Sequence, residues 1–222
     1  MIVAEQKGID EISKSLEDFK SVVVAACGTC VTVCMAGGEK EALKLADLLV
    51  LEAEANGRQL STTVVTPTRQ CDMEFLNDNE DALDSAECIL SLGCGAGVQF
   101  LAEKFPDKVV LPGLNTEFIG VNRDLGYWTE MCQGCGNCLL EKTGGICPVT
   151  RCSKINFNGP CGGSASGKCE IDPNTDCAWQ LIYDRLKRLG RVEKLLEISE
   201  IRDWRTSRDG GPRSVKRHDM IV

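Results

Sequence analysis

Residues 131–179 read MCQGCGNCLLEKTGGICPVTRCSKINFNGPCGGSASGKCEIDPNTDCAW, and this stretch decides how the second half of the chain can fold. Glycine, proline, asparagine and serine fill the intervals between its cysteines, and no apolar run is long enough to build a core. Cysteine sulfur must therefore order the segment, through disulfides, zinc or iron–sulfur clusters. Eight of the fourteen cysteines lie in it: Cys132, Cys135, Cys138, Cys147, Cys152, Cys161, Cys169 and Cys177.

The composition of the chain narrows this choice. A net charge of −8 argues against nucleic acid as a partner, because phosphate binding is led by clustered Lys and Arg. No run reaches the roughly 18 apolar residues that a membrane span needs. Residues 1–19 are polar and acidic, without the basic-then-apolar layout of a signal peptide. We therefore expect a cytoplasmic protein, in which thiols stay reduced and a cysteine-rich pattern indicates metal more often than disulfides.

Histidine is almost absent from the chain. The single histidine, His218, lies far into a polar tail. This argues against mixed Cys/His zinc sites and against histidine base catalysis. Any metal is expected on thiolates, either as all-cysteine zinc or as iron–sulfur clusters.

The first half of the chain alternates apolar runs typical of buried strands with segments of helical period. This alternation predicts an α/β fold with a doubly wound parallel sheet, of the Rossmann or flavodoxin-like kind, over residues 1–122. We expect strands at 21–27, 61–67, 87–94 and 108–114, and helices at 9–20, from about Cys27 to about 56, at 78–86 and from 98 on.

Several cysteines fall at the carboxyl ends of these predicted strands, where open parallel sheets bind ligands. Cys27, Cys71 and Cys94 lie at or just past such ends. If a helix begins near Cys27, then Cys30 and Cys34 share one of its faces with Cys27. The pattern predicts a metal cluster at this edge of the sheet, whereas Cys88, inside its strand, is expected to be a core residue.

Two other interpretations of this edge remain open. Cys27 and Cys30 after a strand resemble a thioredoxin-like dithiol, whose first cysteine is activated at a helix N-terminus. No tryptophan precedes the pair, and a dithiol site does not need the other strand-end cysteines. The glycines around Cys94 could cradle a phosphate, but a lone glycine loop is a weak signal.

The strongest local signal is Cys132-x2-Cys135-x2-Cys138, a spacing at which three thiolates can wrap one face of a cubane cluster. The bacterial ferredoxin run begins in the same way and then places a cysteine before a proline. Here Cys147 precedes Pro148 after eight intervening residues rather than three, so the fourth ligand stays open. Later cysteines could complete a second four-thiolate site, for which zinc is the alternative metal: Cys152, Cys161, Cys169 and Cys177.

We expect residues 123–201 to form an irregular, metal-stapled, cysteine-rich domain that ends in a C-terminal helix. In that helix, Leu181, Ile182, Leu186 and Leu189 lie on one side. Residues 202–222 form a polar, basic tail that is expected to be disordered or ordered on a partner, with Trp204 as a candidate interface anchor.

Long motifs in the chain resemble a known family. They are MCQGCGNCLLEKTGGICPVTRCSKINFNGPCGG, GKCE and DCAWQLIYDRLKRLGR, and upstream ACGTCVTVCMAGGEKEALKLA, TRQCD and LGCGAGVQFLAE. They resemble the methylenetetrahydrofolate reductase C-terminal-type domain family. This family includes the small iron–sulfur subunit of the two-subunit reductase of acetogenic and related anaerobic bacteria. The resemblance spans about residues 20–190.

The resemblance implies a role beside a catalytic subunit, a flavin-bearing TIM barrel that reduces methylenetetrahydrofolate to methyltetrahydrofolate. That reaction belongs to one-carbon metabolism, notably the methyl branch of the acetyl-CoA pathway. This chain would carry two 4Fe-4S clusters and pass electrons to the partner's flavin. The electrons would come from a low-potential donor such as ferredoxin or a further redox subunit. The chain cannot contain the roughly 250-residue barrel as well, so we expect no catalysis by the isolated chain and no catalytic residue in it.

The expected ligands form three groups. The first cluster would use Cys27, Cys30, Cys34 and Cys94, with Cys71 as the substitute for any one of them. The second would use Cys132, Cys135, Cys138 and Cys147, which leaves Cys152, Cys161, Cys169 and Cys177 for a further ion. Two alternatives for the function stay open: a zinc-stabilised scaffold or regulatory subunit without electron transfer, and a dithiol oxidoreductase at Cys27 and Cys30.

Overall fold

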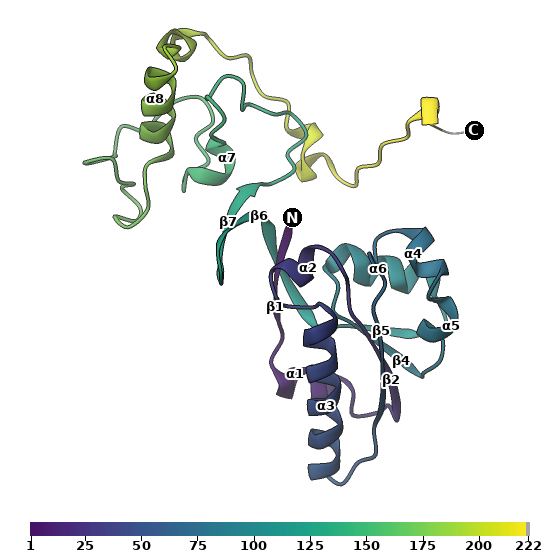
Figure 1. The fold of residues 1–222 in the computed structure, drawn as a ribbon. Helices are drawn as coiled ribbons and strands as arrows, with labels where there is room; N and C mark the ends of the chain where they lie inside the picture. Colours follow the sequence, from purple (N-terminus) through teal and green to yellow (C-terminus); the bar gives the residue numbers. More distant parts are fainter. Residues whose placement is uncertain (221–222) are drawn as a thin grey trace. The chain divides into compact units, whose positions relative to one another are not determined.

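The computed structural model describes residues 1–220, so residues 221–222 of the predicted tail lie outside the described part (Figure 1). The chain divides into two compact units, Met1–Thr129 and Glu130–Val222. The sequence prediction placed this boundary after residue 122. Each unit is described below by itself.

A four-stranded parallel sheet forms the centre of the first unit, with strand order β3-β2-β4-β5. Its strands are β2 (Ser21–Ala25), β3 (Ser61–Val65), β4 (Cys88–Ser91) and β5 (Val109–Pro112). Each begins and ends within the segment predicted for it, because short apolar runs bounded by turn residues are typical of buried parallel strands. The predicted parallel α/β sheet is confirmed.

Helices cover both faces of this sheet (Figure 1). Alternate residues of β2 point to opposite sides: Val22 and Val24 join one core cluster, and Val23 and Ala25 join the other. The first cluster includes residues of α1 (Ile9–Ser15) and α3 (Glu39–Ala55). The second includes residues of α4 (Met73–Asn77), α5 (Glu80–Leu83) and α6 (Gly95–Lys104).

The chain also contains an antiparallel sheet that the sequence analysis did not predict, with the order β1-β6-β7; β1 and β6 belong to the first unit, and β7 continues past Thr129. Its strands are β1 (Ile2–Gln6), β6 (Leu114–Asp124) and β7 (Tyr127–Cys132). β1 pairs with β6 in a register that joins Ile2 to Ile119 and Gln6 to Leu114. Because β1 and its partner β6 lie far apart in the chain, no local sequence pattern near the N-terminus predicts their pairing.

The long helix expected to start near Cys27 is interrupted. A single turn, α2 (Cys30–Val33), is followed by Met35 in the left-handed region with φ 54°, and α3 begins only at Glu39. Gly37 explains the break, because a Cβ on this residue would lie 2.1 Å from the Leu92 carbonyl oxygen. The chain must bend here to fit against the end of β4. The helix begins at Cys30, so Cys27 lies outside it, whereas Cys30 and Cys34 share one turn, in which the Cys34 N–H donates to the Cys30 carbonyl oxygen at 3.3 Å.

Two other helix predictions differ from the structure in extent. The helix expected at 78–86 is replaced by two short helices, α4 and α5, which Asp78 and Asn79 separate. The C-terminal helix α8 (Ala178–Arg188) ends earlier than its apolar pattern indicated, because Gly190 with φ 66° closes it. Leu189, predicted on the packed side of this helix, is exposed.

The second unit has little regular structure. Besides α8 it contains the single turn α7 (Pro148–Arg151) and the 3₁₀ turns η1 (Val192–Leu196), η2 (Trp204–Thr206), η3 (Arg208–Gly210) and η4 (His218–Met220). Its buried apolar side chains are few: Pro148, Val149, Ala178, Ile182 and Leu186. Across residues 1–220, no helix combines the length and the apolar character that a membrane crossing requires.

The close approach at Gly37 can be tested by substitution. We expect Gly37→Ala to lower the free energy of unfolding by about 3 kcal/mol, because its methyl group would collide with backbone rather than with a movable side chain. Gly8→Ala is the matched control: it has open space around its Cβ, and we expect a cost of about 0.5 kcal/mol. Denaturant unfolding followed by circular dichroism under anaerobic conditions measures both. Equal costs would contradict the packing described here.

Candidate metal centres

Three of the predicted strand-end cysteines are neighbours in the structure. Cys27 follows β2, Cys71 lies in the loop after β3, and Cys94 is the residue before α6. The pKa of the Cys71 thiol is raised, first by burial and then by the negative charges that Cys94 and Cys27 would carry. The three residues all follow the carboxyl ends of parallel strands, and Cys71 lies near enough to Cys94 and Cys27 for their charges to act on its thiol.

A buried glutamine holds the loops that carry these cysteines. The Gln70 side chain is 1 % exposed, and its amide Nε2 donates to the carbonyl oxygens of Ala25 and Ala26 at 2.7 and 2.8 Å. Its Oε1 accepts a hydrogen bond of 2.5 Å from the Ser91 hydroxyl, whose oxygen accepts from the Gly93 N–H at 3.1 Å. The donors and acceptors of one side chain thus connect three loops.

Gln70 therefore positions sulfur through its neighbours in the chain. It directly precedes Cys71, Ala26 directly precedes Cys27, and Gly93 directly precedes Cys94. The sequence analysis missed this residue, because a single sequence does not show whether a glutamine will be buried. Its place immediately before a strand-end cysteine was the available signal.

The other cysteines of the first unit have different surroundings. The Cys34 thiol is buried and donates to the carbonyl oxygens of Ala4 and Val31 at 3.6 Å each. Cys30 begins α2 and is partly exposed. Cys88 is fully buried in β4, as expected for a core residue; burial first, and the Glu87 carboxylate second, raises the pKa of its thiol to about 12. Because the Cys34 thiol is buried and already hydrogen-bonded to backbone, these environments favour Cys71 over Cys34 as a ligand beside Cys27 and Cys94.

All fourteen cysteines are free thiols. In the pair Cys27 and Cys30, the first residue is only 8 % exposed. A nucleophilic dithiol needs access for the disulfide that it attacks. Burial of the leading thiol therefore disfavours the dithiol oxidoreductase alternative.

In the second unit, N–H groups point at the sulfurs of the loop 132–138. The Gly134 N–H lies 3.3 Å from Cys132 Sγ, and Arg202 Nη2 donates to Cys135 Sγ at 2.9 Å. Gly134 and Gly136 have φ values of 60° and 80°, which give the loop its tight turns. Donors directed at cysteine sulfur are what thiolate ligands of an iron–sulfur cluster accept, so the loop fits such a group.

Cys147 stands near the base of this loop through α7. It directly precedes Pro148, the first residue of α7. Thr150 in the same turn donates from its hydroxyl to the carbonyl oxygen of Met131 at 3.3 Å. Met131 directly precedes Cys132, so the turn that carries Cys147 is attached to the start of the loop 132–138.

The remaining cysteines of the second unit share one cavity. Its volume is about 20 Å³, and the cysteines that line it are Cys152, Cys161, Cys169 and Cys177. A space of 10–15 Å³ is roughly what one water molecule needs, so this cavity suits a single ion rather than a four-iron cluster. The Gly163 N–H lies 3.4 Å from Cys161 Sγ, and a hydrogen bond with the Ser153 hydroxyl is the main cause that lowers the pKa of Cys169.

None of these groups has the geometry of a closed metal site. Among residues 1–220, no three or more His, Cys, Asp or Glu side chains lie in an arrangement that would hold a metal ion. The structure thus groups Cys152, Cys161, Cys169 and Cys177 around one cavity. The ligand assignments themselves stay predictions.

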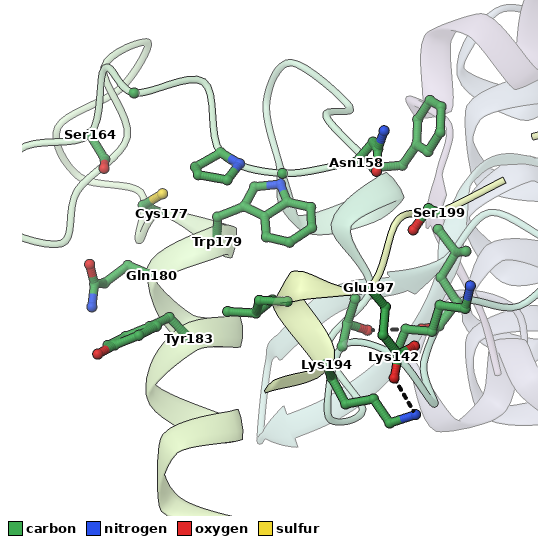
Figure 2. Close-up of a pocket in the computed structure, with 17 residues that line it drawn as sticks. Lys142, Asn158, Ser164, Cys177, Trp179, Gln180, Tyr183, Lys194, Glu197 and Ser199 are labelled. Carbon is green, nitrogen blue, oxygen red and sulfur yellow. Dashed lines mark hydrogen bonds and ion pairs between the residues drawn. The ribbon is translucent and has the colours of Figure 1, made fainter. Parts of the chain in front are cut away.

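A larger cavity of about 380 Å³ lies beside α8 (Figure 2). Trp179 and Tyr183 of α8 line it, and the Trp179 indole N–H donates to the Asn156 carbonyl oxygen at 2.7 Å. Lys194 and Glu197, joined by an ion pair of 3.0 Å, line it as well. Its volume falls within the range of small-molecule sites. The sequence analysis missed this cavity, although two aromatic residues four positions apart on a helix were a visible signal.

Comparison with known proteins identifies a family for part of the chain. Residues 111–205 match the family model described as "Methylene-tetrahydrofolate reductase C terminal". The resemblance predicted from the motifs is confirmed for this segment, which contains all eight cysteines of the second unit. The comparison with curated proteins and the comparison with solved structures gave no match.

The connecting role of Gln70 can be tested by truncation. We expect Gln70→Ala to lower the free energy of unfolding by about 2–3 kcal/mol, because it removes the Gln70 donor from the buried Ala26 carbonyl and from Ala25, whose carbonyl then keeps only the Leu92 N–H, and leaves the Ser91 hydroxyl without its acceptor. The exposed Gln99 provides the control, and Gln99→Ala should stay within about 0.5 kcal/mol of wild type. Urea unfolding of the anaerobically purified chain gives both values. A loss at Gln70 no larger than at Gln99 would contradict the proposed connection.

Proposed function

We propose that this chain is the iron–sulfur electron-transfer subunit of a methylenetetrahydrofolate reductase complex. In this role it would pass electrons to the flavin of the catalytic subunit, which reduces methylenetetrahydrofolate to methyltetrahydrofolate. One observation carries the proposal: the N–H donors directed at the sulfurs of Cys132 and Cys135 lie on a loop within the segment that matches the reductase family.

Two groups of cysteines are proposed as ligands of 4Fe-4S clusters. The loop thiolates Cys132, Cys135 and Cys138, with Cys147, would hold one cluster, and Cys27, Cys30, Cys71 and Cys94 the other. When bound, such clusters exchange single electrons at potentials between about −700 and +450 mV, a range that includes suitable donors for a flavin. The protein's own part is to supply thiolates and to direct N–H groups at their sulfurs.

The cysteines that share the small cavity are proposed as a zinc site. Four thiolates would saturate a tetrahedral ion and leave no open position, so this zinc would be structural. The same cavity is the observation that favours the second candidate function, a zinc-stabilised scaffold of the same complex. The scaffold differs from our proposal in carrying no iron at the loop 132–138.

A short segment that begins at the end of η1 supports docking onto the catalytic subunit. Leu196, Ile198 and Ile201 are 84, 97 and 101 % exposed, and adjoining exposed apolar side chains mark interaction surfaces. All three lie within the segment that matches the reductase family. We propose the flavin-bearing TIM-barrel subunit as the protein that covers them. A low-potential donor such as ferredoxin would deliver electrons, and the complex would work in the cytoplasm.

Metal analysis of single variants tests the ligand sets. We expect Cys135→Ser to remove about four of about eight irons per chain and to leave zinc unchanged. Cys161→Ser should instead remove about one zinc and leave iron unchanged. Cys88→Ser, in a core position that belongs to neither set, is the control and should keep both metals. Loss of iron from Cys161→Ser would contradict the division into separate sites.

Docking and electron transfer can be measured together with the purified flavin subunit. The reduced chain, mixed anaerobically with that subunit, should bleach its flavin absorbance. Ile198→Asp should weaken the complex about 10- to 100-fold, because a carboxylate would be buried in an apolar interface. Leu125→Asp, which changes an exposed leucine at the β6–β7 turn, should bind like wild type. Iron-loaded chain that binds without bleaching the flavin would exclude the electron-transfer role and leave the scaffold.

A further inference from the structure

Arg202 is a buried cation that lacks a carboxylate partner among the described residues. Arg202 is 8 % exposed. Within residues 1–220, it forms no ion pair with a carboxylate. Nη2 donates to Cys135 Sγ at 2.9 Å, whereas Nε and Nη1 are buried without a hydrogen-bond acceptor in that part of the chain. A buried charge is costly unless an opposite charge compensates it. The surroundings of Arg202 are therefore incomplete without an anion.

The position of Arg202 is fixed by the segment that follows it. The Thr206 hydroxyl donates to the Cys135 carbonyl oxygen at 2.9 Å, and Arg213 Nη1 donates to the Gly134 carbonyl oxygen at 2.6 Å. A Cβ on Gly136 would lie 2.3 Å from the Thr206 carbonyl oxygen, so the two backbones pack closely. The segment 202–213 thus lies against the loop 134–136 through several independent contacts.

Aromatic packing holds the guanidinium from its other side. The Arg202 guanidinium carbon lies 4.6 Å from the centre of the Trp204 ring. Trp204 in turn meets Phe157 edge to face, with ring centres 5.5 Å apart. The sequence analysis assigned Trp204 to a partner interface; in the structure it contacts its own chain and orients Arg202 toward Cys135.

We propose that Arg202 is the counter-charge of an anionic, thiolate-bound iron–sulfur cluster at the loop 132–138, and that it raises the reduction potential of that cluster. This inference rests on the proposed function. A one-electron reduction adds negative charge at the loop, and a fixed cation beside Cys135 stabilises the more negative state. Arg202 itself is buried, so water screens its charge less than it screens an exposed arginine.

The chain offers matched variants for a test. Arg202→Gln removes the charge and keeps a polar side chain, and Arg202→Lys keeps the charge but loses the planar fork. Arg208→Gln removes an exposed arginine from the same tail and is the control. Each full-length variant is purified anaerobically, analysed for iron and sulfide, and titrated with a reductant while the electron paramagnetic resonance signal is recorded. The signal that disappears in Cys135→Ser identifies the cluster of this loop.

We expect Arg202→Gln to lower the equilibrium constant for reduction at least about tenfold, which makes the midpoint about 59 mV more negative for each factor of ten. Arg202→Lys should change this constant by less than about threefold, because its charge remains. Arg208→Gln should match wild type. A midpoint for Arg202→Gln equal to that of Arg208→Gln would overturn the proposal, since a merely structural role changes stability and not potential.

If Arg202→Gln does not keep its cluster, its potential cannot be measured, and the iron content of the variants tests the proposal instead. Retention of iron in Arg202→Lys and loss in Arg202→Gln would support the need for charge. Loss in both variants would show that the arginine shape matters instead and would overturn the proposal. A wild-type chain without iron and sulfide would overturn the proposed function itself, and this inference with it.

Discussion

The second unit has very little apolar surface to bury, and everything else in it depends on how its cysteine sulfurs are bound. Its buried apolar side chains are Pro148, Val149, Ala178, Ile182 and Leu186, within the part of the chain that the structure describes. Conformational entropy opposes folding by about 1–2 kcal/mol per ordered residue, which so small a core cannot offset. Metal–thiolate bonds can supply the difference, because their binding free energy becomes folding free energy when the site does not exist in the unfolded chain. We therefore expect order in this unit to be coupled to metal.

The two units position their sulfurs in different ways. In the first, a complete apolar core holds the parallel sheet, and Gln70 fixes the loops before Cys27, Cys71 and Cys94. In the second, the chain wraps around its cysteines, and the tail returns to place Arg202 against Cys135. In the first unit, the packed core and Gln70 hold the cysteine-bearing loops in place. In the second unit, the buried charge of Arg202 needs an anion beside it, which the proposed cluster would supply.

Sequence reasoning located the parallel strands, because buried runs such as SVVVA and CILS are local and unambiguous. It also proposed the cysteine sets from their spacing and from the strand ends, and these sets stay predictions. It missed the antiparallel sheet, since β1 finds its partner β6 more than a hundred residues away. Cys34 was assigned with Cys27 by helical spacing, but the helix begins only at Cys30, and the buried Cys34 thiol donates to the Ala4 carbonyl oxygen. Gln70 and Arg202 act through burial, which a single sequence does not display.

The most direct test of this account is the content of iron, acid-labile sulfide and zinc per chain in protein purified without oxygen. The account predicts about eight irons with about eight sulfides, from two four-iron clusters. It also predicts about one zinc, from the four cysteines that share the small cavity. Zinc without iron and sulfide would contradict the electron-transfer role and favour the scaffold. A well-folded chain that holds neither metal would contradict the central claim that sulfur–metal bonds order the second unit.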